Sequence, residues 1–179
     1  MGACLLIPAR YASSRFEGKP LAMIAGKPMI EHVWRQCKKS KLTAEVVVLT
    51  DNEAIFETVE AFGGKVMMTS ASHPTGTDRL IEASKKLNFD YYINVQGDEP
   101  LIDPALIDSL IKKLGQATSD IVTACHLIDN SDDLFSYNVV KVVRDVNEKA
   151  LYFSRQAIPA HRDIPYKEWL EASDYYKHL

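Results

Sequence analysis

The feature that most constrains the fold of this chain is an alternation of short apolar runs with helix-spaced apolar residues. Five runs have the length of one buried strand each: Ala3–Ile7, Glu45–Thr50, Lys65–Met68, Tyr91–Val95 and Asp120–His126. Between them, apolar residues recur at helical spacing along Met29–Cys37, Ile55–Phe62, Leu80–Leu87 and Leu106–Leu114. Apolar strands separated by amphipathic helices predict a largely parallel sheet covered on both faces. We therefore expect an α/β fold, a doubly wound, mostly parallel Rossmann-like sheet whose ligands bind at the carboxyl ends of its strands.

The pattern changes after Asn138, where we expect a small strand-rich excursion. Val139–Val143 is typical of a strand, Asp145–Lys149 of a turn, and Ala150–Phe153 of a second strand. Tyr175–Leu179 has the composition of the approach to another strand. Because no linker or repeat interrupts the chain, the sequence predicts a single domain over residues 1–179.

Composition narrows the classes of partner and compartment. The 179 residues carry a net charge of −3, which argues against a general nucleic-acid or membrane-surface binder. The cysteines at 4, 37 and 125 have no metal-like spacing, so buried thiols in a reducing compartment are favoured. The apolar start ends at Pro8, too early for a secretory or membrane-spanning segment. These observations predict a cytoplasmic protein.

A basic loop follows the first predicted strand. It holds two serine hydroxyls, a glycine and three cations: Ser13, Ser14, Gly18, Arg10, Arg15 and Lys19. Arginines offer forked donors to phosphate oxygens, and a lysine offers a mobile point charge. The alternative is a plain solvated loop, because there is no G-x-G-x-x-G, and Leu21 and Pro28 break the Walker spacing.

A second candidate site directly follows the predicted strand Tyr91–Val95, where Asn94–Pro100 contains Asp98. Mg²⁺ prefers one or two carboxylates together with phosphate oxygens, so Asp98 near a phosphate loop indicates a metal ligand. The alternative is a helix cap, but Asp103 followed by Pro104 is the better helix start. One carboxylate is an incomplete metal site.

The segment His73–Leu80 is a third candidate, a Thr/Gly-rich turn that leads into an amphipathic helix. A helix N-terminus offers free N–H groups to an anionic or polar ligand, although Thr75 or Thr77 could simply cap the helix. We expect Asp51 to cap the helix that runs through Phe62. His32 and His126 fit structural roles better than ligand roles, which leaves His178 and Arg155 as candidates for function. No pattern indicates a covalent nucleophile.

Six segments occur in order along the chain: Pro8–Arg15, Gly18–Leu21, Gly26–Ile30, Gly76–Arg79, Asn94–Pro100 and Ala150–Arg155. In this combination they resemble the 3-deoxy-manno-octulosonate cytidylyltransferases, also called CMP-Kdo synthetases. The resemblance extends over essentially the whole chain. The Gln-Gly-Asp-Glu-Pro and Ala-Leu-Tyr-Phe-Ser-Arg segments are specific, whereas the Gly-Lys-Pro segments are shared with other nucleotidyltransferases.

The resemblance implies a nucleotide-diphospho-sugar transferase type of fold and an enzyme of lipopolysaccharide biosynthesis in Gram-negative bacteria. The enzyme would transfer CMP from CTP to 3-deoxy-D-manno-octulosonate (Kdo), giving CMP-Kdo and pyrophosphate. It would use Mg²⁺ and form a homodimer, with no nucleic acid or membrane as partner. Nucleotidyl transfer depends on positioning and charge neutralisation more than on a reactive side chain.

By matching position, the resemblance also implies roles for individual residues. Catalysis would involve Lys19, Arg10 and Asp98, with Asp98 as the Mg²⁺ ligand. The nucleotide would contact Pro8, Ala9, Arg10, Ser13, Arg15, Lys19, Thr75, Gly76 and Arg79. The sugar acid would contact Gln96, Arg155 and His178.

Two departures from the family pattern affect these expectations. Ser14 and Glu17 stand where the family commonly has Thr and Pro, and Glu17 adds a negative charge beside the phosphate loop. We also expect the chain to be truncated at its C-terminus relative to the family, without the second metal-binding aspartate. The alternatives are a cytidylyltransferase for 8-amino-Kdo or sialic acid, a metal-dependent glycosyltransferase, and an inactive nucleotide-binding fragment.

Overall fold

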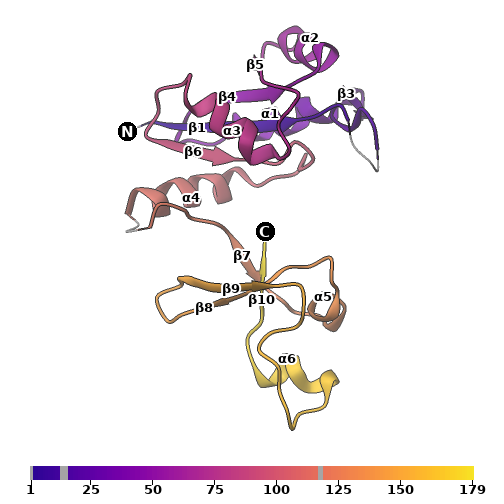
Figure 1. Ribbon diagram of the computed structural model, residues 1–179, viewed down its shortest axis with the longest axis vertical. Coiled ribbons are helices and arrows are strands. Elements are labelled where there is room, and N and C mark those ends of the chain that lie inside the picture. Colours follow the sequence, from indigo (N-terminus) through magenta and orange to yellow (C-terminus); the bar gives the residue numbers. More distant parts are fainter. Residues whose placement is uncertain (1, 13–15, 117–118) are drawn as a thin grey trace. The chain divides into compact units, whose positions relative to one another are not determined.

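The computed structural model describes residues 2–12, 16–116 and 119–179. These form two compact units, Met1–Asp120 and Ile121–Leu179 (Figure 1). The sequence predicted one domain over this span with a strand-rich excursion after Asn138, whereas the second unit begins earlier, at Ile121. The main sheet of the first unit lies between two buried clusters, and the second unit has a sheet and a buried cluster of its own.

The first unit is built on a four-stranded parallel sheet. Its strands are, in spatial order, β5 (Lys65–Met68), β4 (Thr43–Thr50), β1 (Ala3–Ala9) and β6 (Tyr91–Asn94). Leu5 of β1 lies opposite Val46 of β4 on one side and Ile93 of β6 on the other. The parallel sheet predicted from the apolar runs is confirmed, with β1 at its centre.

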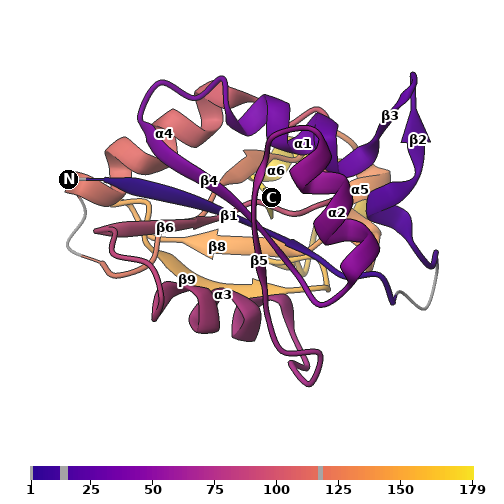
Figure 2. The ribbon, with the colours of Figure 1, turned by 90° about the horizontal axis from the view of Figure 1, so that it is seen from above.

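Helices cover both faces of this sheet, as a doubly wound fold requires. Alternate residues of β1 point to opposite faces, so Leu5 belongs to one buried cluster and Leu6 to another. The Leu5 cluster is closed by α1 (Met29–Cys37), α2 (Glu53–Ala61) and α4 (Pro104–Gln116). The Leu6 cluster is closed by α3 (Gly76–Ser84). Figure 2 shows α3 on one side of the sheet and α1 and α4 on the other.

The helix starts confirm two sequence predictions and correct a third. Asp103 accepts a hydrogen bond from the Ala105 N–H at 2.8 Å where α4 begins. Thr75 is the N-cap of α3. The prediction that Asp51 caps α2 is wrong, because the neighbouring Asn52 accepts the Ile55 N–H at 3.2 Å. Asp51 is therefore available for another contact.

A short segment joins β1 to α1. It contains the 3₁₀ helix η1 (Lys19–Leu21) and a two-stranded antiparallel ribbon, β2 (Met23–Ile24) and β3 (Lys27–Pro28). Gly18 precedes η1 with a left-handed backbone (φ 68°), and its N–H donates to the Tyr11 carbonyl at 2.8 Å. This conformation favours glycine and turns the chain from the basic loop into η1.

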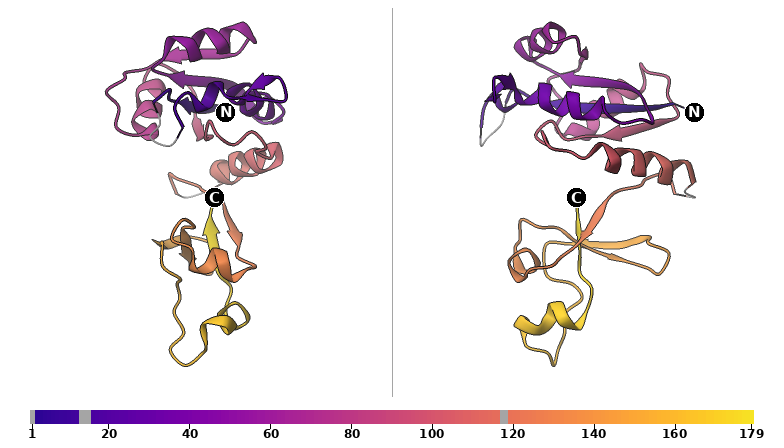
Figure 3. Two further views of the ribbon diagram at one scale, coloured as in Figure 1. Left: turned by 90° about the vertical axis from the view of Figure 1, so that its right-hand side faces the viewer. Right: turned by 180° about the vertical axis from the view of Figure 1, so that it is seen from behind.

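The second unit has an antiparallel sheet of four strands. Their order is β7 (Cys125–Leu127), β10 (Tyr176–His178), β8 (Lys141–Arg144) and β9 (Ala150–Ser154). The right-hand view of Figure 3 shows the β8–β9 hairpin along its length. The hairpin predicted after Asn138 and the terminal strand are confirmed.

The rest of the second unit packs around an aromatic cluster. The strands are joined through α5 (Ser131–Phe135), η2 (Tyr166–Glu168) and α6 (Trp169–Ala172). Trp169 and Tyr175 are buried there with Ile128 and Leu134. The strand predicted over Asp120–His126 is wrong for its first half, because Ile121 is 83% exposed and pairing begins only at Cys125.

Within the described part of the chain, no helix is both long enough and apolar enough to cross a membrane.

Candidate active site

Segments far apart in the sequence meet at the carboxyl edge of the parallel sheet, around Pro8. Pro8 and Ala9 end β1, and the loop after β6 lies beside them. A Cβ on Gly97 would stand 2.8 Å from the Pro8 carbonyl oxygen, and a Cβ on Gly76 would stand 3.5 Å from Pro8 Cγ. The backbones of the second and third candidate segments therefore both approach the first strand end closely.

An ion pair joins the basic loop to the loop after β6. Lys19 Nζ lies 2.6 Å from Asp98 Oδ2, and the two side chains are 37% and 49% exposed. An exposed pair of this kind contributes about 1 kcal/mol or less to folding. Both groups consequently remain accessible to a ligand, and the structure brings together two of the three predicted catalytic residues.

The structure describes only some of the other residues predicted to act in the basic loop. Arg10 directly follows β1 and is half-buried. Ser13 and Arg15, predicted to hold the triphosphate, lie outside the described residues. Their roles stay predictions.

Asp98 provides the oxygen chemistry that Mg²⁺ needs. Among the described residues no cluster of three or more His, Cys, Asp or Glu side chains could hold a metal ion. A single carboxylate nevertheless fits an ion that takes its remaining oxygens from phosphates and water. Burial, and then the charge of Asp98, raises the pKa of the neighbouring Glu99 carboxyl. The donor set fits a nucleotide-borne Mg²⁺.

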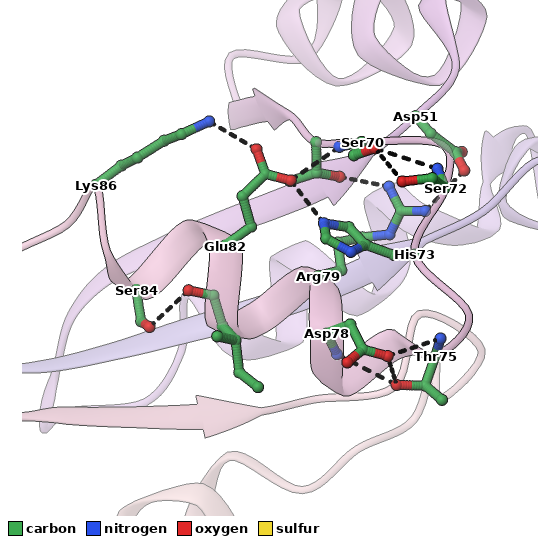
Figure 4. Close-up of polar contacts among 12 residues, drawn as sticks. Asp51, Ser70, Ser72, His73, Thr75, Asp78, Arg79, Glu82, Ser84 and Lys86 are labelled. Atoms are coloured by element: carbon green, nitrogen blue, oxygen red, sulfur yellow. Dashed lines mark hydrogen bonds and ion pairs between the residues drawn. The ribbon is translucent and has the colours of Figure 1, made fainter.

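The start of α3 is organised by a reciprocal cap. The Asp78 N–H donates to Thr75 Oγ1 at 3.2 Å, and the Thr75 N–H donates to Asp78 Oδ2 at 3.1 Å. Figure 4 shows these contacts at the first turn of the helix. The cap fixes the conformation of Thr75 and Gly76, to which the family resemblance gives a place in the nucleotide pocket.

Arg79 lies one turn further into α3, and its side chain is completely buried. Its guanidinium donates to the Asp51 carboxylate at 2.7 Å and to the Thr69 hydroxyl. In this structure Arg79 is thus directed at the ends of β4 and β5, as Figure 4 shows. Its predicted contact with the nucleotide stays a prediction.

A second polar network holds the loop between β5 and α3. Glu82 Oε2 accepts from the Ser70 N–H at 2.8 Å and lies 2.7 Å from His73 Nε2, while its Oε1 accepts from Lys86 Nζ at 2.7 Å (Figure 4). The Lys86 ammonium, followed by the Ser70 N–H and His73, lowers the pKa of Glu82 to about 2. The loop is therefore tied to the helix by an ionised carboxylate.

The predicted sugar-binding residues are divided between the two units. Gln96 is exposed in the first unit, beyond the end of β6. In the second unit, the Arg155 guanidinium donates to the Tyr137 carbonyl at 2.7 Å, and His178 Nε2 lies 2.7 Å from Thr123 Oγ1. Arg155 follows the end of β9, and its carbonyl accepts from the buried Lys141 at 2.9 Å.

Sequence reasoning missed two residues of this edge. The motif that contains Gly97 gave this residue no role of its own, although a glycine directly after a strand can mark close backbone contact. Asp51 was assigned to a cap. Its contact with Arg79 spans 28 positions, so no local pattern could reveal it.

The protein-family model described as Cytidylyltransferase matches residues 4–178 of this chain. The chain belongs to the cytidylyltransferase family. Two similar relatives are named 3-deoxy-manno-octulosonate cytidylyltransferase. The protein from Geotalea daltonii is 52% identical over 94% of this chain and 66% of its own length. The protein from Thermodesulfovibrio yellowstonii is 48% identical over 97% of this chain and 71% of its own length.

A solved cytidylyltransferase structure is similar over the whole chain. It is described as CMP:2-keto-3-deoxy-manno-octonic acid synthetase complexed with CTP, with 42% identity, a TM-score of 0.91, and coverage of 100% of this chain and 72% of that one. The family resemblance and the α/β fold class predicted from the sequence are thereby confirmed. The chain spans about two thirds of the length of the curated relatives it matches.

Proposed function

We propose that this cytidylyltransferase transfers CMP from CTP to Kdo and releases pyrophosphate, in the cytoplasmic synthesis of lipopolysaccharide precursors. The observation that carries the proposal is the Lys19–Asp98 contact of 2.6 Å, which joins a phosphate-type loop to a carboxylate at the carboxyl edge of the sheet. Further support comes from relatives at about 50% identity that bear the name of this activity.

In the proposed reaction, the anomeric hydroxyl of the sugar attacks the α-phosphorus of CTP in line with the departing pyrophosphate. One P–O bond forms, the bond to the pyrophosphate oxygen breaks, and the hydroxyl proton is released. Lys19 and Arg10 would hold the triphosphate oxygens, with Ser13 and Arg15 as further donors. Fixed cations at these oxygens favour the transition state because they offset the negative charge spread over the phosphoryl group.

Asp98 would hold Mg²⁺ together with oxygens of the bound nucleotide. The ion would supply charge neutralisation at the phosphates. In the ligand-free chain Lys19 Nζ donates to Asp98 Oδ2 at 2.6 Å, so this carboxylate already holds one cationic group at the edge where the metal would bind.

Different residues would contact the nucleotide and the sugar acid. Pro8, Ala9, Thr75, Gly76 and Arg79 would surround the cytidine. Gln96, Arg155 and His178 would contact the sugar acid, whose carboxylate suits the forked donors of an arginine.

We also propose that the protein acts as a homodimer through the second unit. β9 is the last strand of its sheet and pairs with β8 alone in the strand order. Leu151, Tyr152 and Phe153 on this strand are all exposed. An exposed apolar edge strand favours association with another strand or apolar surface.

The test is pyrophosphate release from CTP and Mg²⁺ with Kdo, 8-amino-Kdo and sialic acid supplied in parallel. Turnover with Kdo supports the proposal, and turnover with one of the other two sugars alone reassigns the substrate. Turnover that needs ATP, GTP or a sugar 1-phosphate contradicts it, as does CTP binding with no turnover, which would indicate a nucleotide-binding fragment.

Substitution of Lys19 tests the site directly. Lys19→Ala should lower kcat by about 100-fold, a typical loss when one charge-stabilising donor is removed, while the unfolding free energy changes by about 1 kcal/mol or less. Lys65→Ala is the matched control, since it removes a similarly exposed lysine paired with Glu45 at 2.9 Å away from the carboxyl edge. Wild-type kcat in Lys19→Ala would rule out the assigned role.

A further inference from the structure

The pair formed by Asp51 and Arg79 is unusual for its degree of burial. Arg79 is among the largest fully buried side chains of the chain, and its charge is met by the Asp51 carboxylate at 2.7 Å. Its Nε is also buried and makes no hydrogen bond within the described residues. A buried guanidinium depends strongly on its few partners, because water cannot replace a lost one.

The contacts of Arg79 connect three elements of the sheet edge. Asp51 follows the end of β4, Thr69 follows the end of β5, and Arg79 belongs to α3. Thr69 is in turn bound to the last residue of β4, because its N–H and its hydroxyl both donate to the Thr50 carbonyl, at 2.8 and 3.0 Å. The first turns of α3 are consequently fastened to the carboxyl ends of two neighbouring strands (Figure 4).

The contacts of Arg79 lie one helical turn from the residues proposed to bind the nucleotide. Thr75 and Gly76 lie one turn before Arg79 on the same helix, and Gly76 packs against Pro8 at 3.5 Å from its would-be Cβ. A helix turn moves as a unit because its backbone hydrogen bonds link successive turns. A shift of Arg79 would therefore carry Thr75 and Gly76 with it and open the contact with Pro8.

We propose that Asp51 is a positioning residue for the nucleotide, acting through Arg79 to hold Thr75 and Gly76 against the end of β1. Asp51 touches neither substrate, and its effect falls on CTP binding. The inference deepens the proposed function and rests on it, because it assumes that Thr75 and Gly76 line the CTP site.

The experiment compares Asp51→Asn with wild type, with Asp51→Glu and with a matched control. Asparagine keeps the size of the side chain and removes its charge, whereas glutamate keeps the charge. Glu45→Gln is the control, because it makes the same change in an ion pair with Lys65 on the same two strands, β4 and β5, away from their carboxyl ends. The dissociation constant for CTP with Mg²⁺, the KM for CTP, the KM for Kdo and kcat are measured for the full chain.

Asp51→Asn should raise the dissociation constant and the KM for CTP about tenfold, with the KM for Kdo unchanged, and Asp51→Glu should recover part of the loss. Amide exchange in ligand-free protein should speed up at Asp78, whose N–H donates to Thr75 Oγ1, in Asp51→Asn and stay unchanged there in Glu45→Gln. Wild-type CTP affinity and exchange in Asp51→Asn would overturn the inference. A fall limited to thermal stability, with KM values unchanged, would also overturn it and leave a structural pair.

Two further comparisons distinguish a variant that fails to fold from a failure of the proposed function. If Asp51→Asn does not fold, Thr69→Val replaces it, since it removes a neutral hydroxyl from the same guanidinium, and unchanged CTP affinity there refutes the inference. If wild type itself neither binds CTP nor releases pyrophosphate, the proposed function fails, while the exchange measurement still decides whether Asp51 holds the helix start.

Discussion

Replacement of Gly97 by alanine is the most direct test of how the site is assembled. Gly97 has no positive φ, so an alanine there meets no backbone strain of its own. Its Cβ would instead stand 2.8 Å from the Pro8 carbonyl oxygen and 3.7 Å from Ile7 Cγ2. The closer neighbour is backbone at the end of the central strand, which cannot rotate away as a side chain could.

The size of the effect follows from that distance. Ordinary van der Waals contact begins at 3.4 Å, so the two backbones must separate by about 0.6 Å. Overpacking of this kind typically destabilises by about 1 to 3 kcal/mol, which corresponds to a Tm lower by about 3 °C per kcal/mol for a chain of this size. Displacement of catalytic groups by a fraction of an ångström should lower kcat/KM for CTP by about 10- to 100-fold.

The assay pairs thermal unfolding with pyrophosphate release under varied CTP. Gly115→Ala is the matched control, because Gly115 lies exposed in α4 with only Tyr91 Oη, at 3.9 Å, near its would-be Cβ. That variant should keep wild-type kcat/KM and gain up to about 1 kcal/mol, since alanine favours a helix over glycine. Wild-type Tm and kcat/KM in Gly97→Ala would refute the close packing of the two loops.

Two further predictions follow from the pKa shifts. The pKa of Glu82 is lowered from 4.5 to about 2, so its contribution to stability is complete above pH 4.5 and is lost as the pH falls toward 2. Acid unfolding followed by circular dichroism should therefore show a shallower loss of stability over that range in Glu82→Gln than in wild type, and identical curves would contradict this role. Burial raises the pKa of Cys4 to about 11 and of Cys37 to about 12, so iodoacetamide at pH 8 should modify the partly exposed Cys125 alone in native protein. If mass spectrometry finds Cys4 or Cys37 labelled at a rate comparable to that of Cys125, their burial in the native protein is excluded.

The parallel sheet was predictable because its signal is local. Leu5, Leu6 and Ile7 form a continuous apolar run, and a strand buried on both faces is the structure such a run favours. The same rule failed at Asp120–His126, where Ile121 stays 83% exposed. Apolar composition alone cannot tell whether a neighbouring strand is present to pair with, and pairing began only at Cys125.

The site was predictable as far as the topology of the sheet determines it. Parallel strands place their carboxyl ends on one edge, so the proximity of Lys19 and Asp98 follows from the element order. The role of Asp51 did not follow. An aspartate and an asparagine in adjacent positions are equally good caps, and the choice between them depends on Arg79, which only the tertiary structure brings near.

The central position of β1 also has a consequence for synthesis on the ribosome. The strand is made before both of the strands that pair with its two edges, β4 and then β6, and β6 follows β5 and α3 in the chain. Until Tyr91–Asn94 has been added, one edge of an entirely apolar strand stays open to other chains. Nascent chains halted before β6 should therefore depend on chaperones for solubility, whereas those extended through α4 should form the first unit without them.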